Sequence, residues 1–468
     1  MIGGGQSGLA AGYHLRRLGL DFVILDAGPS PGGAWLRAWD SLRLFSPAAY
    51  SSLPGRLMPP QPGETYPGAA HVVAYLSAYE ERYDLPVHRP VRVSGVHHDG
   101  ALLRVETDAG TWLARAVISA TGTWSRPFVP AVPGRDEFGG TQLHTVGYEN
   151  AAAFAGKRVT VVGGGNSGAQ IAADLAMADS ESAGRPWLHS VDADGRPADI
   201  ATADCGSAGR PWLDRVDADG RPADLATADS ESDGRQSTHP ADADRRPAKL
   251  ATADCGSAGR PWLDRVDADG RPADLATADS ESDGRQSTHP VDAGRPSAAL
   301  AYGVELTWVT LREPRYLPDD IDGRALFDHA TARRRALDEG RADTGGVASL
   351  GDIVAVPPVR AARDAGLLKA RPMFARLTRT GVEWADGTRA DADVIIWCTG
   401  FRPALAHLAP LGLRDRRGHI ATTGTQALGE PRVHLLGYGD WTGPASATLI
   451  GVGRPAREAA RSIARLLD

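Results

Sequence analysis

Residues 158–176 read RVTVVGGGNSGAQIAADLA, in which three glycines follow directly on a run of β-branched residues. The run at 159–162 predicts a buried strand, and the residues after the glycines predict a helix that contains Gln170–Ala176. In a strand–turn–helix unit with the spacing G-x-G-x-x-G, the first glycine makes the tight turn and the second lets backbone amides approach a pyrophosphate. The third lets the helix pack on the strand. The three glycines are Gly163, Gly165 and Gly168. The stretch therefore predicts a Rossmann-like unit that binds a dinucleotide.

The same spacing occurs at the start of the chain, in Gly3, Gly5 and Gly8. A helix-like LAAGYHLRRLG follows, and then a strand-like stretch at 22–25 that ends in Asp26, which is placed to accept hydrogen bonds from a ribose. Glycine turns in an enzyme that binds no dinucleotide are the alternative, and two such units in one chain disfavour it. A glycine turn of this kind normally follows a strand of about 5 residues. Only two residues precede the first glycine, so we expect the true amino terminus to lie upstream.

The residues after the next strand of the second unit indicate which nucleotide it binds. Val304–Thr310 (VELTWVT) predicts that strand, and no acid follows it at the ribose position. Arg312 stands there instead, with Arg315 close behind. Arginine can pair with a 2′-phosphate, whereas a carboxylate would repel it, so the pattern favours NADPH over NADH. The alternative is that Arg312 merely faces solvent.

A repetitive segment, residues 178–301, interrupts this second unit. Residues 201–240 recur without change at 251–290, and a 25-residue period underlies the 50-residue one. The few apolar residues of each repeat bury little surface to offset chain entropy, so we predict a disordered insertion into a surface loop rather than a solenoid. The Asp-Ala-Asp-Gly pieces lack the other oxygen ligands of a calcium loop, and no metal site is predicted.

Composition narrows the function classes. The net charge is −7 and the pI is about 6.0, which gives no electrostatic reason to bind nucleic acid or an anionic membrane. No apolar run approaches the roughly 20 residues that span a bilayer, and no signal peptide is visible, so a cytoplasmic protein is expected. The three cysteines form no C-x-x-C pair, which argues against a dithiol redox centre.

Five further motifs lie outside the two glycine turns: FGGTQLHTVGY at 138–148, GGAW at 32–35, ATG at 120–122, CTG at 398–400 and LLGYGD at 435–440. Together they resemble the class B flavin-containing and Baeyer–Villiger monooxygenases, and the resemblance covers essentially the whole chain outside the repeats. The stretches 39–55 and 438–453 are most similar to the flavin monooxygenases of bacterial arsenic-resistance operons.

The resemblance implies an α/β fold of two Rossmann-like, three-layer ββα dinucleotide-binding domains, one for FAD and one for NADP. The expected division is 1–152 and 393–468 for the FAD-binding domain, 153–177 and 302–392 for the NAD(P)-binding domain, and 178–301 for the insertion. A helix beginning near Ser446 would point its amino terminus at the flavin.

The glycine turns and the resemblance together assign candidate residues to each cofactor. For FAD these are Gly3, Gly5, Gly8, Asp26, Gly33, Trp35, Thr121, Gly122, Gly400, Gly439 and Asp440. For NADPH, with NADH as the alternative, they are Gly163, Gly165, Asn166, Ser167, Gly168, Arg312 and Arg315.

The chemistry that the resemblance implies is reduction of FAD by NADPH, followed by transfer of one oxygen atom from O₂ to a small soft nucleophile or a ketone, with an arsenical as one option. His144 would couple NADPH binding to the flavin, and a hydrogen-bonded structural histidine is an equal alternative. Arg402 would add positive charge at the domain junction or pair with a surface acid. Eukaryotic members position oxygen with an asparagine that residues 41–46 (SLRLFS) lack, so Ser46 is the candidate substitute.

Two other functions stay open at this stage. A flavin reductase or oxidase without oxygenation would share the same two dinucleotide sites. A non-catalytic, degraded paralogue is suggested by the short first strand and the repeats. The expected partners are the small-molecule substrate and O₂. The one protein partner considered is a second copy of this chain, in a homodimer.

Overall fold

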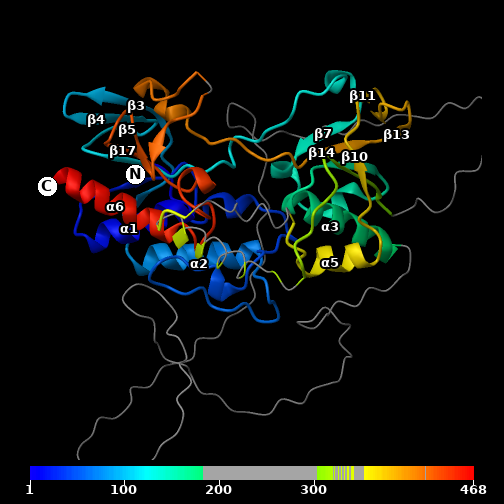
Figure 1. Ribbon diagram of the computed structural model, residues 1–468, viewed down its shortest axis with the longest axis horizontal. Coiled ribbons are helices and arrows are strands. Elements are labelled where there is room, and N and C mark those ends of the chain that lie inside the picture. Colours follow the sequence, from blue (N-terminus) through cyan, green and yellow to red (C-terminus); the bar gives the residue numbers. More distant parts are fainter. Residues whose placement is uncertain are drawn as a thin grey trace, which may run out of the picture. The chain divides into compact units, whose positions relative to one another are not determined.

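The computed structural model describes residues 1–182, 303–319, 353–416 and 418–468, with scattered positions between 321 and 341. Of the segment 178–301 that was predicted to be disordered, residues 178–182 are helical instead, and the rest lies outside these ranges. The described residues belong to one unit, which contains two α/β folds (Figure 1).

The first fold is built on a sheet whose central position is taken by Ile2. Its elements are α1 (Gln6–Arg17), β1 (Ile24–Leu25), α2 (Ala69–Arg82), β2 (Val87–His88), β3 (Val93–Asp99), β4 (Leu102–Thr107), β5 (Gly110–Ala114), β6 (Val117–Ser119), β15 (Thr422–Thr423), β16 (Gln426–Ala427), β17 (Val433–Leu435) and α6 (Gly453–Leu467). Parallel pairs join β1 to β2 and β6 to β17. Ile2 bridges Leu25 on one side and Ser119 on the other, so it links the two pairs. The expected strand at 22–25 is therefore shorter than predicted and begins at Ile24.

Helices cover one face of this sheet and a second sheet covers the other. Ile24 and Ile118 lie in a core with α1, α2 and α6, whereas their neighbours Leu25 and Val117 lie in a core with the antiparallel sheet β3-β4-β5. This division follows from the two-residue period of a strand. Helices α1 and α6, from opposite ends of the chain, pack side by side (Figure 1). The layers are those of the predicted ββα domain.

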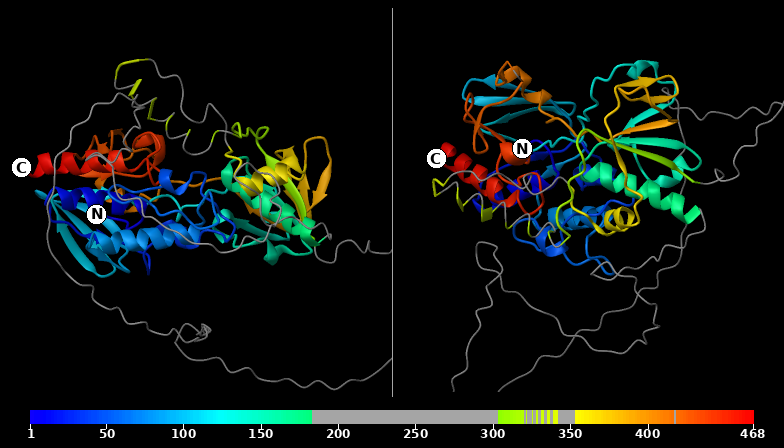
Figure 2. Two further views of the ribbon diagram at one scale, coloured as in Figure 1. Left: turned by 90° about the horizontal axis from the view of Figure 1, so that it is seen from below. Right: turned by 45° about the vertical axis from the view of Figure 1, so that its right-hand side comes forward.

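The second fold repeats this plan. Its elements are β7 (Thr141–His144), β8 (Arg158–Val162), α3 (Asn166–Ser182), β9 (Glu305–Thr310), α5 (Pro357–Asp364), β10 (Ala370–Pro372), β11 (Arg376–Thr378), β12 (Gly381–Glu383), β13 (Arg389–Asp391) and β14 (Val394–Trp397). The parallel sheet has the order β10-β9-β8-β14-β7, and β11-β12-β13 forms a separate antiparallel sheet. Val161 and Ile396 lie in the core that includes side chains of α3 and α5, and Val162 and Trp397 lie in the core on the β11-β12-β13 side. Helices α3 and α5 run next to each other on one face of the sheet (Figure 2).

Two strands, β7 and β14, lie in the second fold, although the predicted division of the chain placed them in the first. Boundaries at 152 and 393 assigned β7 and β14 to the first domain, but β14 pairs with both β7 and β8 in the second sheet. The expected division differs from the structure because strand pairing decides the fold to which a strand belongs, and local sequence does not show that pairing. The turn at 120–122 follows β6 of the first fold, whereas the turn at 398–400 follows β14 of the second.

The two connections between the folds are hydrogen bonded to each other. Pro127 and Phe401 form an antiparallel bridge. On either side of it, the Phe128 amide donates to the Gly400 carbonyl at 3.0 Å and the Arg402 amide donates to the Arg126 carbonyl at 2.8 Å. The chain therefore passes between the folds as a short two-stranded ribbon.

Candidate functional site

The first glycine turn joins Ile2 to α1 and requires glycine at two of its three positions. Gly3 has a φ of 101°, and a Cβ on it would lie 2.5 Å from the Ala120 carbonyl oxygen. A Cβ on Gly8 would lie 1.9 Å from the Gly3 carbonyl oxygen. Gly5 differs, because it has an ordinary φ of −78° and the nearest atom to its Cβ would be the Gly33 Cα at 3.9 Å. The protein itself therefore has room for a side chain at Gly5, although the amides of the helix amino terminus point toward that space.

Two of the other predicted FAD motifs, GGAW and ATG, contact this turn. A Cβ on Gly33, whose φ is 57°, would lie 2.9 Å from the Gly5 Cα. The indole of Trp35 donates to the Gln6 side chain at 3.0 Å. The ATG motif contributes the carbonyl against which Gly3 packs. Segments far apart in the sequence thus gather around one glycine turn.

The late motif reaches the same place from the carboxyl-terminal end of the chain. A Cβ on Gly437 would lie 2.2 Å from the Ser7 hydroxyl, so only glycine fits there. Gly439 has a φ of 69°, and Asp440 after it is exposed. Helix α6 begins at Gly453 rather than near Ser446, and turns occupy the residues between them.

A buried polar network fixes the ATG turn. The Thr121 hydroxyl donates to the Ala404 carbonyl at 2.8 Å and lies 2.8 Å from the Tyr438 hydroxyl. Tyr438 in turn lies 3.3 Å from the Ser119 hydroxyl. Gly122, with a φ of 62°, lets the chain leave the sheet at this point. The network was not predicted, since its members are far apart in sequence and the motifs that contain Thr121 and Tyr438 do not show that these side chains meet.

Asp26 directly follows β1, as predicted, and the structure shows that it is buried. Its carboxylate accepts a hydrogen bond from Arg89 Nε at 2.7 Å, and Arg89 was not identified from the sequence. A charged residue before a proline is common at the end of a strand, so no local signal marks it. Only the pairing of β1 with β2 brings the two residues together.

The second glycine turn has the same construction as the first. Gly163 has a φ of 149°, and a Cβ on it would lie 2.3 Å from the Cys398 carbonyl oxygen. A Cβ on Gly168 would lie 2.2 Å from the Gly163 carbonyl oxygen. That oxygen also accepts a hydrogen bond from the Trp308 indole at 2.8 Å. A Cβ on Gly165 would meet no protein atom within 4 Å, so this position, like Gly5, faces open space.

The other candidates for the second site lie around this turn. Asn166, at the start of α3, accepts a hydrogen bond from the Val354 amide at 2.8 Å, and Ser167 follows it half-buried in the first turn. Arg312 is exposed, and its carbonyl oxygen would lie 4.0 Å from a Cβ on Gly164, the residue between the first two glycines. Arg315 is also exposed, and its carbonyl accepts a bond from the Ile353 amide. The structure therefore brings Arg312 to the edge of the glycine turn.

His144 is held inside the ribbon that connects the folds. Its Nε2 lies 3.0 Å from the Gly400 carbonyl, and its Nδ1 accepts from the Val146 amide at 3.4 Å. The ring meets Phe401 edge-on with 4.9 Å between centroids. Burial lowers the pKa of His144 below its ordinary value, although the bond to Gly400 opposes this. Both ring nitrogens suit a neutral imidazole, with Nε2 as the donor.

The remaining two catalytic candidates are engaged with other protein groups. The Arg402 guanidinium lies over the Phe128 ring, 4.5 Å from its centroid. The Ser46 hydroxyl is buried and lies 2.8 Å from the Ser51 hydroxyl. Ser51 can also donate to the Pro47 carbonyl, so the Ser46 proton has an acceptor within the protein core.

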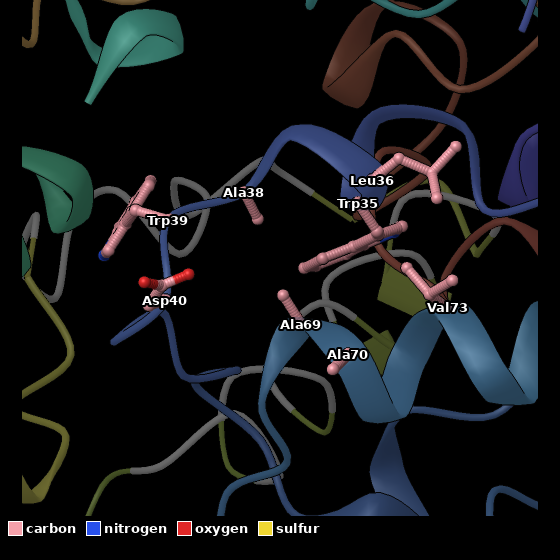
Figure 3. A pocket seen from close by; sticks show the side chains of 8 residues that line it. All are labelled: Trp35, Leu36, Ala38, Trp39, Asp40, Ala69, Ala70 and Val73. Atoms are coloured by element: carbon pink, nitrogen blue, oxygen red, sulfur yellow. The ribbon is translucent and has the colours of Figure 1, made fainter. Parts of the chain in front are cut away.

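A pocket of about 380 Å³ lies beside the first glycine turn (Figure 3). It is lined by Trp35, Leu36, Ala38, Trp39, Asp40, Ala69, Ala70 and Val73. Asp40 is the one charged side chain among them, and the indole of Trp35 extends toward Ala69 across the pocket (Figure 3). Because Trp35 is bonded to Gln6, the pocket adjoins the turn itself. Its walls suit a small and mostly apolar molecule.

Within the described ranges, no group of three or more His, Cys, Asp or Glu side chains could hold a metal ion. None of the helices in that part of the chain is long and apolar enough to cross a membrane. Cys398 is the cysteine that these ranges contain, and burial raises the pKa of its thiol to about 12.

The amino-terminal part of the chain matches known proteins. Residues 1–182 match the family model described as pyridine nucleotide-disulphide oxidoreductase. The uncharacterized oxidoreductase CzcO-like of Geobacillus kaustophilus is 35% identical over 175 residues, which are 37% of this chain and 50% of the relative. Indole-3-pyruvate monooxygenase YUCCA1 of Oryza sativa subsp. japonica is 37% identical over 180 residues, which are 37% of this chain and 44% of the relative. The chain thus spans about half the length of the curated relatives it matches.

A solved structure matches over the whole chain. A flavin-containing monooxygenase from Stenotrophomonas maltophilia is 39% identical, with a TM-score of 0.67, and the match covers 100% of this chain and 98% of that chain. This likeness confirms the predicted α/β fold and the predicted flavoprotein class. With its two glycine turns at the carboxyl ends of parallel strands, the chain belongs to the flavin-containing monooxygenase family.

Proposed function

We propose that the protein is an FAD- and NADPH-dependent monooxygenase that transfers one oxygen atom from O₂ to a small soft nucleophile or a ketone. The observation that carries the proposal is the pair of glycine turns. In each turn a Cβ on the first or third glycine would collide with backbone, while the second glycine faces space that the protein does not fill. Bound FAD would supply the redox chemistry, as the acceptor of a hydride and the reductant of O₂.

The residues of the chain hold and orient the two nucleotides. Around the first turn, the α1 amino terminus would face the diphosphate of FAD, Asp26 would accept hydrogen bonds from a ribose, and Asp440 would bind the ribityl chain. Around the second turn, the amino terminus of α3 would do the same for NADPH, and Arg312 would pair with its 2′-phosphate. His144, neutral and fixed between the two folds, acts as a positioning residue for the ribbon.

The size and the lining of the pocket beside Trp35 favour a small substrate. Its eight lining residues include one carboxylate, and the others are apolar or aromatic. Sulfides, amines, ketones and arsenicals of this size are the classes to screen. None of them needs a side-chain nucleophile, because the oxygen is delivered by the cofactor.

The decisive experiment follows the flavin spectrum after anaerobic reduction. The full chain is loaded with FAD, reduced with NADPH and mixed with O₂ in a stopped-flow instrument. We expect a spectral species that differs from both oxidised and reduced flavin, and that decays faster when a substrate of the right class is present. If the flavin returned directly to its oxidised form with every substrate class, the protein would be a reductase or an oxidase instead. A chain that takes up no FAD would support the non-catalytic alternative.

Replacing Arg312 by alanine is expected to remove the preference for NADPH. A hydrogen bond to a charged group is worth about 1.5–3 kcal/mol, so the KM for NADPH should rise about 10- to 100-fold. The KM for NADH, which lacks the 2′-phosphate, should change little. Steady-state kinetics with both nucleotides give the comparison. Arg389→Ala, which removes an exposed arginine of the same fold, is the matched control. An equal loss with both nucleotides would show that Arg312 has another role.

A further inference from the structure

A parallel strand pair in the first fold places a basic residue beside Asp26. In the register of β1 and β2, Leu25 pairs with His88, so the residues that follow them are neighbours at the carboxyl edge of the sheet. The Asp26 amide donates to the His88 carbonyl at 3.0 Å. Asp26 and Arg89 therefore leave the sheet side by side, and both point to the edge where the first glycine turn lies.

Arg89 uses its guanidinium to join two carboxylates. Its Nε donates to Asp26 Oδ2 at 2.7 Å. Its two terminal nitrogens donate to the two oxygens of Glu80 on α2, at 2.5 and 2.7 Å. A two-point contact of this kind fixes the plane of the guanidinium. Glu80 thus holds Arg89, and Arg89 holds the carboxylate of Asp26 in one orientation.

The triad is buried against the glycine turn. The side chains of Asp26 and Arg89 are 11% and 10% exposed, and that of Glu80 is 16% exposed. A Cβ on Gly4 would lie 2.9 Å from Asp26 Oδ2 and 3.0 Å from a terminal nitrogen of Arg89. Burial disfavours the charged guanidinium, yet the hydrogen bonds to Glu80 and Asp26 raise the pKa of Arg89 above its ordinary value. The three groups carry one net negative charge.

The other carboxylate oxygen of Asp26, Oδ1, accepts a weaker hydrogen bond. Oδ1 accepts from the Gly28 amide at 3.4 Å, a long hydrogen bond, while Oδ2 is taken by Arg89. The carboxylate is therefore turned so that one oxygen serves the protein and the other retains most of its capacity to accept a hydrogen bond. A ribose diol presents the donors that such an oxygen needs.

We propose that Arg89 is a positioning residue for FAD, which orients Asp26 toward the adenosine ribose, and that the net negative triad excludes a 2′-phosphorylated nucleotide from this first site. The inference rests on the proposed function, because it assumes that the first glycine turn binds FAD. It adds a residue to the site and gives the physical reason why NADPH does not compete there, since a phosphate beside this triad would meet uncompensated negative charge.

The test is a double-mutant cycle on FAD affinity in the full chain. The apoprotein is titrated with FAD and the quenching of flavin fluorescence gives Kd for the wild type, Arg89→Met, Asp26→Asn and the double variant. We expect Arg89→Met to weaken FAD about 10- to 100-fold, as for other residues that orient a ligand group. In the Asp26→Asn background the same change should have little further effect, since the group that Arg89 orients is altered.

Further variants separate positioning from stability. Arg89→Lys keeps the charge without the two-point contact and should fall between the wild type and Arg89→Met. Glu80→Met combined with Arg89→Met leaves one buried carboxylate, Asp26, where Arg89→Met alone leaves two, and should still bind FAD weakly while unfolding at a higher temperature than Arg89→Met. Arg16→Met, which breaks the exposed pair with Asp84 in the same fold, is the matched control and should bind FAD normally.

The outcomes distinguish this inference from the function on which it rests. A wild-type chain that does not bind FAD would overturn the proposed function. Normal FAD binding by the variant that lacks both Glu80 and Arg89, or equal effects of Arg89→Met in both backgrounds, would overturn the positioning role alone. Competition of NADPH with FAD in the wild type at equal affinity would contradict the exclusion of the 2′-phosphate.

Discussion

Gly5→Ala should weaken FAD binding by up to about 100-fold while leaving the fold intact. At a φ of −78° and a ψ of −172°, alanine takes the backbone conformation of Gly5 without strain. Its Cβ would meet no protein atom closer than the Gly33 Cα at 3.9 Å. The methyl group would occupy the space at the amino terminus of α1, where a diphosphate approaches the backbone. Overpacking costs about 1–3 kcal/mol, so Kd should rise up to about 100-fold.

The measurement is again flavin fluorescence quenching, with thermal unfolding of the apoprotein beside it. The melting temperature should stay at the wild-type value or rise slightly, because alanine restricts the unfolded chain. Gly8→Ala gives the contrast, since its Cβ would lie 1.9 Å from a backbone oxygen and must lower the melting temperature as well. Normal flavin binding by Gly5→Ala would show that no ligand approaches this turn.

Gly165→Ala is expected to give the reciprocal result at the second site. The Cβ again has open space around it, so the fold and FAD binding should be retained. NADPH should reduce the bound flavin poorly, with an apparent Kd for NADPH raised up to about 100-fold. Anaerobic reduction rates at increasing NADPH give this constant, and dithionite shows that the flavin itself remains reducible.

Gly5→Ala and Gly165→Ala serve as controls for each other. If Gly5→Ala loses FAD and Gly165→Ala loses NADPH, each turn holds the nucleotide that the proposal gives it. If Gly165→Ala also released FAD, the two turns would not act as separate sites, and the assignment of two nucleotides to two folds would fail.

The sequence predicts the fold well because local patterns carry most of it. The run at 159–162 and the glycines after it specify a strand, a turn and a helix within 20 residues, and β8 and α3 form there. The boundary between the two folds is harder to predict from the sequence, because it depends on which strands pair with each other. CTG at 398–400 and ATG at 120–122 share their last two residues and each follows a strand, yet β14 pairs with β7 and β8 of the second sheet.

Some residues of the candidate site can likewise be identified from local motifs, and others only from contacts in the folded chain. The glycines of both turns and Asp26 belong to spaced motifs, so they could be found from the chain alone. Arg89 belongs to no spaced motif, and Tyr438 lies within one that does not reveal its contacts, because both act through residues distant in sequence. Ser46 was chosen by its place in a motif, and the structure pairs it with Ser51 inside the core.

The first fold draws on both ends of the chain, and this has a consequence for biosynthesis. Gly437, which packs on Ser7, lies 430 positions after it. At about 5–20 residues per second, a ribosome needs roughly 20–90 s to synthesise that interval. All strands of the second fold precede β17 and α6 in the chain, so that fold can form on the nascent chain. Gly437 therefore cannot pack on Ser7 until after the strands of the second fold have been synthesised.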